Sequence, residues 1–240
     1  AARGGHPTMP STYERTASDE FRVVDTWDGG FGWQAHPDEF GARTSHAVET
    51  ADGVWLFDPL DAPGIDDRID DLGTVAGVVV CSDYHARDAE AFVCRHDVPV
   101  TVPMWLSRIE ERIDTDTERV NGRVAGFELR RLRPLRAWRE TVAYREHDGT
   151  LYVPDFLSTH PKFTVGDERL GMPTVSRLSP PREQFDCEPD RILLGHGEGL
   201  FEDATGALAA ALTGARRRFP RALVTNLPGE IRAMAGALRD

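Results

Sequence analysis

The feature that most constrains the fold of this chain is a short apolar run, Gly77–Cys81, flanked by two helical patterns. An unbroken run of this kind is typical of a strand buried on both faces, as in a parallel sheet that helices cover. Pro63–Leu72 before it and Arg87–Arg95 after it each place apolar residues on one helical face, and Val98–Val102 follows as a further strand. This alternation of strands and helices favours an α/β layered fold.

The remainder of the chain supplies more strands and two more helices. An Asp-Gly pair at 52–53 between two extended runs indicates a hairpin. The expected strands are 21–24, 45–50, 54–57, 125–133, 140–145, 151–153 and 191–194, and the expected helices are 203–218, with Asp203 as its N-cap, and 228–238. Two mixed sheets with helices outside, an αββα sandwich, accommodate this order. We expect one domain over residues 21–240, preceded by a loose, flexible N-terminal tail over residues 1–20.

The charge balance argues against one class of partner. Among 240 residues, 40 are acidic and 28 basic, which gives a formal net charge of −12, and Lys162 is the only lysine. General nucleic-acid binding requires a basic footprint, so we expect no nucleic-acid partner. The acidic balance fits a halophilic protein, because carboxylates hold water and ions in high salt. Codon bias in a GC-rich genome is the alternative explanation for the scarcity of lysine.

Cysteine count and hydropathy exclude further classes. Cys81, Cys94 and Cys187 include no Cys-x-x-Cys pair and are odd in number, which excludes a disulfide framework and a cysteine-rich zinc site. No run approaches the roughly 18–20 apolar residues that span a bilayer, and the N-terminus lacks the apolar core of a signal peptide. We therefore expect a cytoplasmic protein without a membrane partner.

Residues of metal-ligand type follow three of the expected strands. Asp83, His85 and Asp88 crowd the turn after the buried strand, Asp155 follows 151–153, and His196 stands between two glycines after 191–194. Rigid strand ends position side chains well, and His and Asp are ordinary ligands of zinc, iron and manganese. Each residue also has a plain structural interpretation: the aspartates could cap a helix or end a strand, and the histidines could lie in surface turns.

In this order of elements and strand ends the chain resembles the metallo-β-lactamase superfamily of hydrolases. Leu56-Phe57-Asp58-Pro59 is similar to the end of that family's early strand pair. The segment 81–89 occupies the place of its His-x-His-x-Asp-His signature. Val153-Pro154-Asp155 looks like the strand whose Asp bridges two metals, and Leu194-Gly195-His196-Gly197 looks like the final Gly-His motif. The resemblance covers roughly residues 44–218 and implies the αββα fold with a metal site at the strand ends.

The chain departs from the signature at several positions. Asp83 stands at the first His position, His85 matches the second, Arg87 replaces the Asp, and Asp88 replaces the last His. The family's mid-chain histidine is absent, and 134–139 stands there instead. A guanidinium cannot ligate a cation. The resemblance therefore implies at most one zinc, iron or manganese ion, or a metal-free site, with ligands drawn from Asp83, His85, Asp88, Asp155 and His196.

The resemblance implies a hydrolase in which activated water attacks an ester, thioester or phosphodiester of a small molecule. Asp83 or Asp88 would act as base, and Arg87 would pair with a carboxylate in the pocket or bind an anionic substrate. His46 and His160 are candidates to replace lost ligands. Two alternatives stay open: a non-catalytic binding or scaffold protein that has lost its metal centre, and a metal-free hydrolase that uses Asp–His acid–base chemistry.

Overall fold

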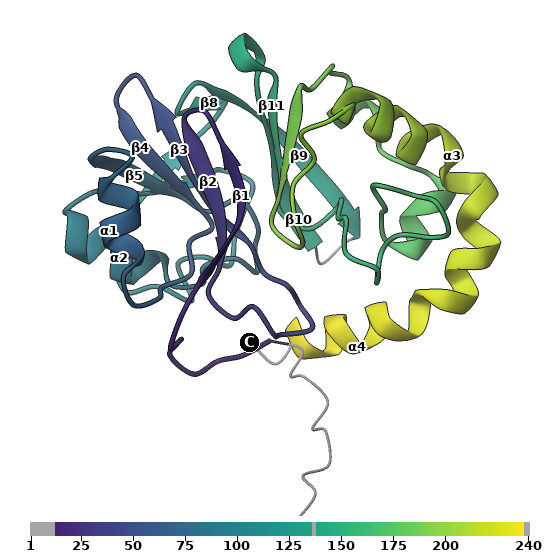
Figure 1. Cartoon of the computed structure of the whole chain (residues 1–240), viewed down its shortest axis with the longest axis horizontal. Coiled ribbons are helices and arrows are strands. Elements are labelled where there is room, and N and C mark those ends of the chain that lie inside the picture. The colour runs from purple at the N-terminus through teal and green to yellow at the C-terminus, as the bar shows by residue number, and fades with distance from the viewer. Residues whose placement is uncertain (1–12, 136–137, 238–240) are drawn as a thin grey trace, which may run out of the picture.

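The computed structural model describes residues 13–135 and 138–237. Two β-sheets face each other, and helices cover their outer faces (Figure 1). The αββα sandwich expected from the sequence is confirmed. In the described part of the chain, no helix is long and apolar enough to cross a membrane.

The first sheet is antiparallel at one edge and parallel at the other. Its described strands, in spatial order, are β1 (Arg22–Trp27), β2 (Gly30–Gln34), β3 (Ser45–Thr50), β4 (Gly53–Phe57), β5 (Val75–Val79), β6 (Val100–Pro103) and β7 (Thr117–Val120). Strands β1 to β4 pair antiparallel, whereas β4 to β7 pair parallel. The carboxyl ends of β4 and β5 therefore meet at one edge of the sheet.

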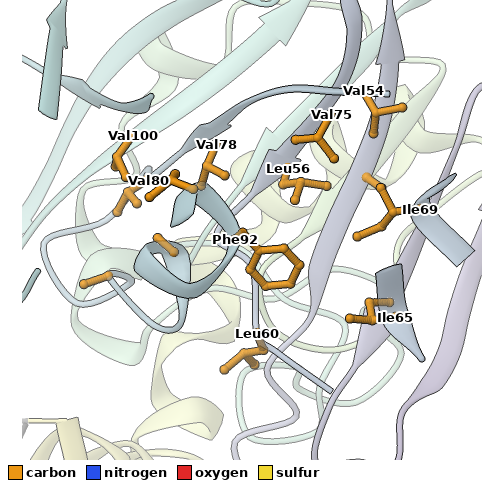
Figure 2. Packing of buried hydrophobic residues seen from close by; sticks show 14 of the residues in the cluster. Val54, Leu56, Leu60, Ile65, Ile69, Val75, Val78, Val80, Phe92 and Val100 are labelled. Atoms are coloured by element: carbon orange, nitrogen blue, oxygen red, sulfur yellow. The ribbon is translucent and has the colours of Figure 1, made fainter. Parts of the chain in front are cut away.

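Two short helices cross over between the parallel strands and cover the outer face of this sheet. They are α1 (Ile65–Asp70) and α2 (Ala89–His96). Phe92 of α2 lies at the centre of the apolar layer, among side chains of β4, β5, β6 and α1 (Figure 2). Burial of these side chains fixes the position of the loop after β5.

The second sheet brings the later strands together. Its order is β12 (Arg191–Leu194), β11 (Thr150–Val153), β10 (Trp138–Arg145), β9 (Phe127–Leu135) and β8 (Arg123–Val124). Strands β11 and β12 are parallel, so their carboxyl ends also lie together. Helix α3 (Ala204–Thr225) packs its alanine- and leucine-rich face on this sheet.

Main-chain contacts join the two sheets at these strand ends. The amide of Thr141 donates to the carbonyl of Cys81 at 2.7 Å, and the amide of Thr44 donates to the carbonyl of Gly195 at 2.9 Å. Between the sheets, the rings of Phe57, Phe127 and Tyr152 pack edge to face. The carboxyl ends of β4, β5, β11 and β12 consequently surround one point.

Helix α4 (Leu227–Ala237) follows α3 and runs along the bottom of the view in Figure 1. The carboxylate of Glu230 accepts hydrogen bonds from the amide and hydroxyl of Thr174, at 2.9 and 2.8 Å. Asn226, at the junction of α3 and α4, donates to the carbonyl of Thr164 at 2.9 Å. This junction therefore fixes the long connection 158–181, which contains the 3₁₀ turn η2 (Thr174–Leu178).

The structure corrects several expected boundaries. Strand β5 ends at Val79 rather than at residue 81, and β2, β7 and β8 were not expected. Helix α3 continues past Pro220 to Thr225. Asp203 precedes α3 with a left-handed backbone, φ 47°, and its side chain makes no capping hydrogen bond within the described residues. Asp203 is therefore at the predicted N-cap position, but it lacks the extended backbone with which a capping side chain ordinarily reaches the first free amides.

Of the segment expected to be a loose tail, residues 1–12 lie outside the described residues. Among the rest, Tyr13 packs its ring edge against His196, with 6.3 Å between the ring centroids. The amide of Glu14 donates to Glu39 at 3.0 Å, and Arg43 donates to the carbonyl of Glu14 at 2.6 Å. Residues 13 and 14 are therefore anchored beside the strand ends.

Candidate metal centre

His85 lies in the loop after β5, and its ring is held by Asp58 at the end of β4. Nδ1 of His85 is 2.8 Å from Oδ2 of Asp58. The same oxygen accepts the hydroxyl of Tyr152 at 2.5 Å, and Oδ1 accepts the amide of Cys81 at 2.7 Å. Asp58 has a left-handed backbone, φ 47°, which is costly for a residue other than glycine and turns its carboxylate into this network.

His196 follows β12 and is held by a main-chain carbonyl. Its Nδ1 is 2.7 Å from the carbonyl oxygen of Gly41. The hydroxyl of Ser158 donates to the carbonyl of His196 at 2.7 Å, which fixes the main chain at this position. The ring is buried, with Nε2 facing the end of β11.

Asp155, which follows β11, joins the two rings. Its Oδ1 is 3.1 Å from Nε2 of His85 and 3.0 Å from Nε2 of His196, and its Oδ2 accepts the hydroxyl of Ser82 at 2.7 Å. Among the described residues these three form a group of ligand type, with the ligand atoms all within 4.8 Å of one another. A tetrahedral ion with bonds near 2.0–2.1 Å holds its ligand atoms roughly 3.3 Å apart, which is close to the two separations seen here.

The hydrogen bond that Nδ1 makes in each ring determines which ring nitrogen carries the hydrogen and which carries the lone pair. A carboxylate and a carbonyl only accept, so Nδ1 carries the hydrogen in both His85 and His196. In a neutral ring, Nε2 then presents a lone pair to Oδ1 of Asp155. Two acceptors at 3.0 Å need either a proton or a cation between them.

The pKa values of the two rings differ. Burial and the charge of Lys162 lower the pKa of His196 to about 4, which favours the neutral ring, whose one hydrogen lies on Nδ1. Burial and Arg87 oppose protonation of His85, but the carboxylates of Asp155 and Asp58 outweigh them and raise its pKa. Burial likewise opposes ionisation of Asp155, yet the two histidines hold its pKa well below the usual range. With the hydrogen of His196 on Nδ1, its Nε2 offers a lone pair to a cation beside Asp155.

Asp83 and Asp88 lie outside this group of three and face main-chain donors. Oδ1 of Asp83 accepts the amides of Ser107 and Arg108, at 2.8 and 3.2 Å. Oδ2 of Asp88 accepts the amide of Asp61 at 2.8 Å. Of the five residues expected as ligands, the structure thus brings together His85, Asp155 and His196.

Arg87 points toward the centre, but its partners differ from those expected. Within the described residues it donates to the carbonyls of Thr44, Asp58 and Gly195, at 2.9, 2.8 and 3.1 Å, and not to a carboxylate. Its Nη2 is also 3.3 Å from Nε2 of His85. The guanidinium therefore ties the ends of three strands together and places a fixed positive charge beside the centre.

The two histidines considered as replacement ligands lie outside the group. His46 is fully buried between the sheets, 3.5 Å from Asp25, with its ring against Tyr152. Nδ1 of His160 accepts the amide of Lys162 at 3.2 Å, and burial with the Lys162 charge lowers the pKa of His160 to about 4.

Sequence reasoning missed Glu140, which lies next to the place of the missing mid-chain histidine. Its carboxylate is fully buried and accepts the amide of Phe156 at 3.1 Å and the indole hydrogen of Trp138 at 3.0 Å. Burial and the charge of Asp155 raise the pKa of Glu140 well above its usual range. The one local signal was an acidic residue at the start of the strand expected over residues 140–145. Residues 136–137 of the segment expected there lie outside the described residues.

Comparison with known proteins identifies the fold. No family model and no curated protein sequence matches the chain. The structure is similar to the metallo-β-lactamase from Pontibacter korlensis, with a TM-score of 0.58 and 15% identity over 82% of this chain and 99% of that chain. It is similar to the metallo-β-lactamase FIM-1 from Pseudomonas aeruginosa in its mono-zinc form, with a TM-score of 0.55 and 11% identity over 85% and 98%.

A third similar structure is TTHA1623 in a di-iron-bound form, with a TM-score of 0.51 and 19% identity over 70% of this chain and 92% of that chain. The chain therefore has the metallo-β-lactamase fold, with a candidate His/Asp metal site at the strand ends where the sequence resemblance had indicated one.

Proposed function

We propose that this protein is a hydrolase of the metallo-β-lactamase fold that holds one metal ion at His85, Asp155 and His196. Its substrate is an ester, thioester or phosphodiester of a small molecule. The observation that carries the proposal is the convergence of two histidine Nε2 atoms on one carboxylate oxygen, with the hydrogen of each ring committed on its far side. Asp58 and the Gly41 carbonyl supply the supporting contacts that metal-ligating histidines commonly have.

The nature of the donor set supports zinc, iron or manganese. Two imidazoles and one carboxylate suit any of these ions. A bound ion of this kind lowers the pKa of a water ligand toward about 7 and polarises the scissile group. Asp58 orients His85, and Ser82 orients Asp155 through its second oxygen.

Arg87 supports a single ion rather than two. Its guanidinium has only donors and stays charged, so it neither ligates a cation nor favours a second one nearby. From its place beside His85 it is suited to stabilise negative charge that develops on an oxygen of the scissile group.

A chelation experiment with a matched histidine control tests this proposal. The protein is stripped with a chelator, assayed on 4-nitrophenyl esters, thioesters and bis(4-nitrophenyl) phosphate, and assayed again after addition of zinc, manganese or iron(II). We expect activity that disappears with the metal and returns with it. His196→Ala abolishes activity, whereas His147→Ala, at an exposed position, does not change it. Failure of all three substrate classes with a loaded metal site would favour the binding or scaffold alternative.

A further inference from the structure

A cavity of about 480 Å³ lies beside the metal centre. Tyr13 and Arg87 line it, whereas the three ligand residues are not part of its described lining. The ring of Tyr13 meets the ring of His196, with 6.3 Å between the ring centroids. Nη2 of Arg87 is 3.3 Å from Nε2 of His85. Tyr13 and Arg87 therefore separate the cavity from the centre.

Of these two residues, Arg87 is held firmly. Its guanidinium donates to three main-chain carbonyls, at 2.9, 2.8 and 3.1 Å. The side chain of Tyr13 is held by ring contacts, with His196 and with the guanidinium of Arg43, which lies 5.5 Å from the ring centroid. Ring contacts of these kinds are weaker than hydrogen bonds between charged groups. Tyr13 is therefore the side chain of this pair that moves more easily.

The main chain next to Tyr13 is fixed by a buried ion pair. Arg43 donates to both carboxylate oxygens of Glu39 at 2.8 Å, and the Glu39 side chain is 1% exposed. Oε2 of Glu39 accepts the amide of Glu14 at 3.0 Å. Nη2 of Arg43 donates to the carbonyl of Glu14 at 2.6 Å. Both main-chain polar groups of the residue that follows Tyr13 are thus held.

The loop that carries this ion pair also positions His196. Nδ1 of His196 donates to the carbonyl of Gly41 at 2.7 Å, and the amide of Gly197 donates to the carbonyl of Ala42 at 2.9 Å. The attachment point of the Tyr13 side chain is consequently fixed relative to His196. Rotation about the side-chain bonds of Tyr13 moves its ring away from His196 without moving the main chain.

We propose that Tyr13 is a gate between the cavity and the metal centre, meaning a side chain whose rotation opens and closes the passage. With the ring against His196 the passage is narrow, so Tyr13 admits substrates whose reacting group is small and slows those with a bulky one. The part of this statement that concerns substrates rests on the proposed function. The part that concerns access to His196 does not.

The first experiment measures access to His196 in chelator-treated full-length protein. Diethyl pyrocarbonate modifies neutral imidazole nitrogens that it reaches, and peptide mass spectrometry gives the rate for each histidine. The rate for His196 is divided by that for the exposed His147 in the same sample. We expect this ratio to be about tenfold higher in Tyr13→Ala than in wild type, because the wild-type ring must first move away.

Two matched variants accompany this comparison. Tyr13→Phe keeps the ring and loses the hydroxyl, so His196 reacts as in wild type. Tyr144→Ala removes a half-buried tyrosine ring from β10 and leaves the rate for His196 unchanged.

Two results would overturn the inference. One is an equal rate for His196 in wild type and Tyr13→Ala, which would mean that the ring does not control access. The other is an acceleration of the fully buried His46 by the same factor as His196 in Tyr13→Ala, which would mean a general opening of the fold.

A kinetic comparison separates the gate from the proposed function. With metal-loaded protein, Tyr13→Ala raises the ratio of kcat/KM for 4-nitrophenyl benzoate to that for 4-nitrophenyl acetate about tenfold. Faster modification of His196 without hydrolysis of either ester would refute the proposed function and keep the gate. Hydrolysis of both esters, with an unchanged ratio and an unchanged rate of modification, would refute the gate and keep the function.

Discussion

At the scale of single residues, Asp58 determines how His85 faces the centre. It lies at the end of β4, outside the signature segment, and one of its oxygens receives both the His85 ring and the Tyr152 hydroxyl. The supporting contact is thus provided by a different strand from the one that precedes the ligand.

We predict that Asp58→Asn weakens metal binding about 10–100-fold without unfolding the protein. Asparagine tolerates the left-handed backbone at this position, but its amide group would put a second donor against the Nδ1 hydrogen of His85. The measurement is competition against a chromophoric chelator, with Asp52→Asn in the exposed hairpin turn as the control. An unchanged dissociation constant would contradict the role given to Asp58.

Lys162 is the one lysine of the chain, and it is buried beside the centre. Its ammonium donates at 3.3 Å to the Gly41 carbonyl, which also receives the His196 ring. Burial lowers its pKa from 10.5 to about 8, although the carboxylates of Asp155, Glu39 and Glu230 oppose this shift. Between pH 8 and 10.5 the unfolded chain therefore binds more protons at this site than the folded one does.

Lys162→Met should consequently reveal a pH-dependent difference in stability. Lys162 contributes a term to the wild-type free energy of unfolding that rises with pH from about 8 to 10.5, by up to ~3 kcal/mol, and the variant lacks this term. Urea unfolding at pH 7, 8.5 and 10.5 in metal-free protein measures it. The stability of the variant relative to wild type must fall as pH rises; a constant difference would mean that the ammonium is not held in an unfavourable environment.

At the scale of elements, helix α4 holds the connection 158–181 through Glu230 and Thr174. Because the amide of Thr174 has its acceptor on another element, its protection from hydrogen exchange depends on α4 staying docked.

Glu230→Ala should raise the exchange rate of the peptide that contains Thr174, while the peptide of β5 (Val75–Val79) exchanges as before. Hydrogen–deuterium exchange with mass spectrometry gives both rates in one experiment. Glu188→Ala, at an exposed position, serves as the control variant. Equal exchange of the Thr174 peptide in wild type and Glu230→Ala would show that α4 does not restrain this connection.

Much of this element order could be predicted from the sequence, because apolar runs and helical periodicity are local. His85, Asp155 and His196 could be found for the same reason, since each lies in the loop that follows an apolar strand. The contacts that distinguish ligands from structural carboxylates are not local: Asp83 meets the amide of Ser107, 24 residues away. No pattern of spacing in the sequence indicates that contact. The sequence alone therefore could not distinguish Asp83 and Asp88 from the three residues that converge.

A predicted helix boundary was wrong where tertiary packing outweighed the local preference of the sequence. The expected helix ended at residue 218, two residues before Pro220, yet α3 continues to Thr225 and leads into α4. Proline removes one donor and kinks or ends helices in isolation. Here the turn after it is held by Ala222, which is buried, and by the Asn226 side chain, which bonds the connection 158–181.

At the scale of the whole molecule, the chain has 40 acidic and 28 basic residues. This negative net charge makes the thermal stability of the fold depend on salt. Repulsion among like charges falls as the Debye length shrinks from about 10 Å at 0.1 M to about 3 Å at 1 M. We predict that the thermal unfolding midpoint rises between 0.1 and 2 M KCl. Scanning calorimetry at several KCl concentrations measures this, and a midpoint that stays level or declines would contradict adaptation to high salt.

The central claim concerns the number of metal ions in the whole molecule, and elemental analysis by mass spectrometry tests it most directly. Untagged protein is incubated with excess zinc, iron(II) or manganese, desalted, and compared with Asp155→Ala and His196→Ala. We predict about one ion per chain in wild type and none in either variant. Two ions per chain, or none in wild type, would contradict the single-ion centre.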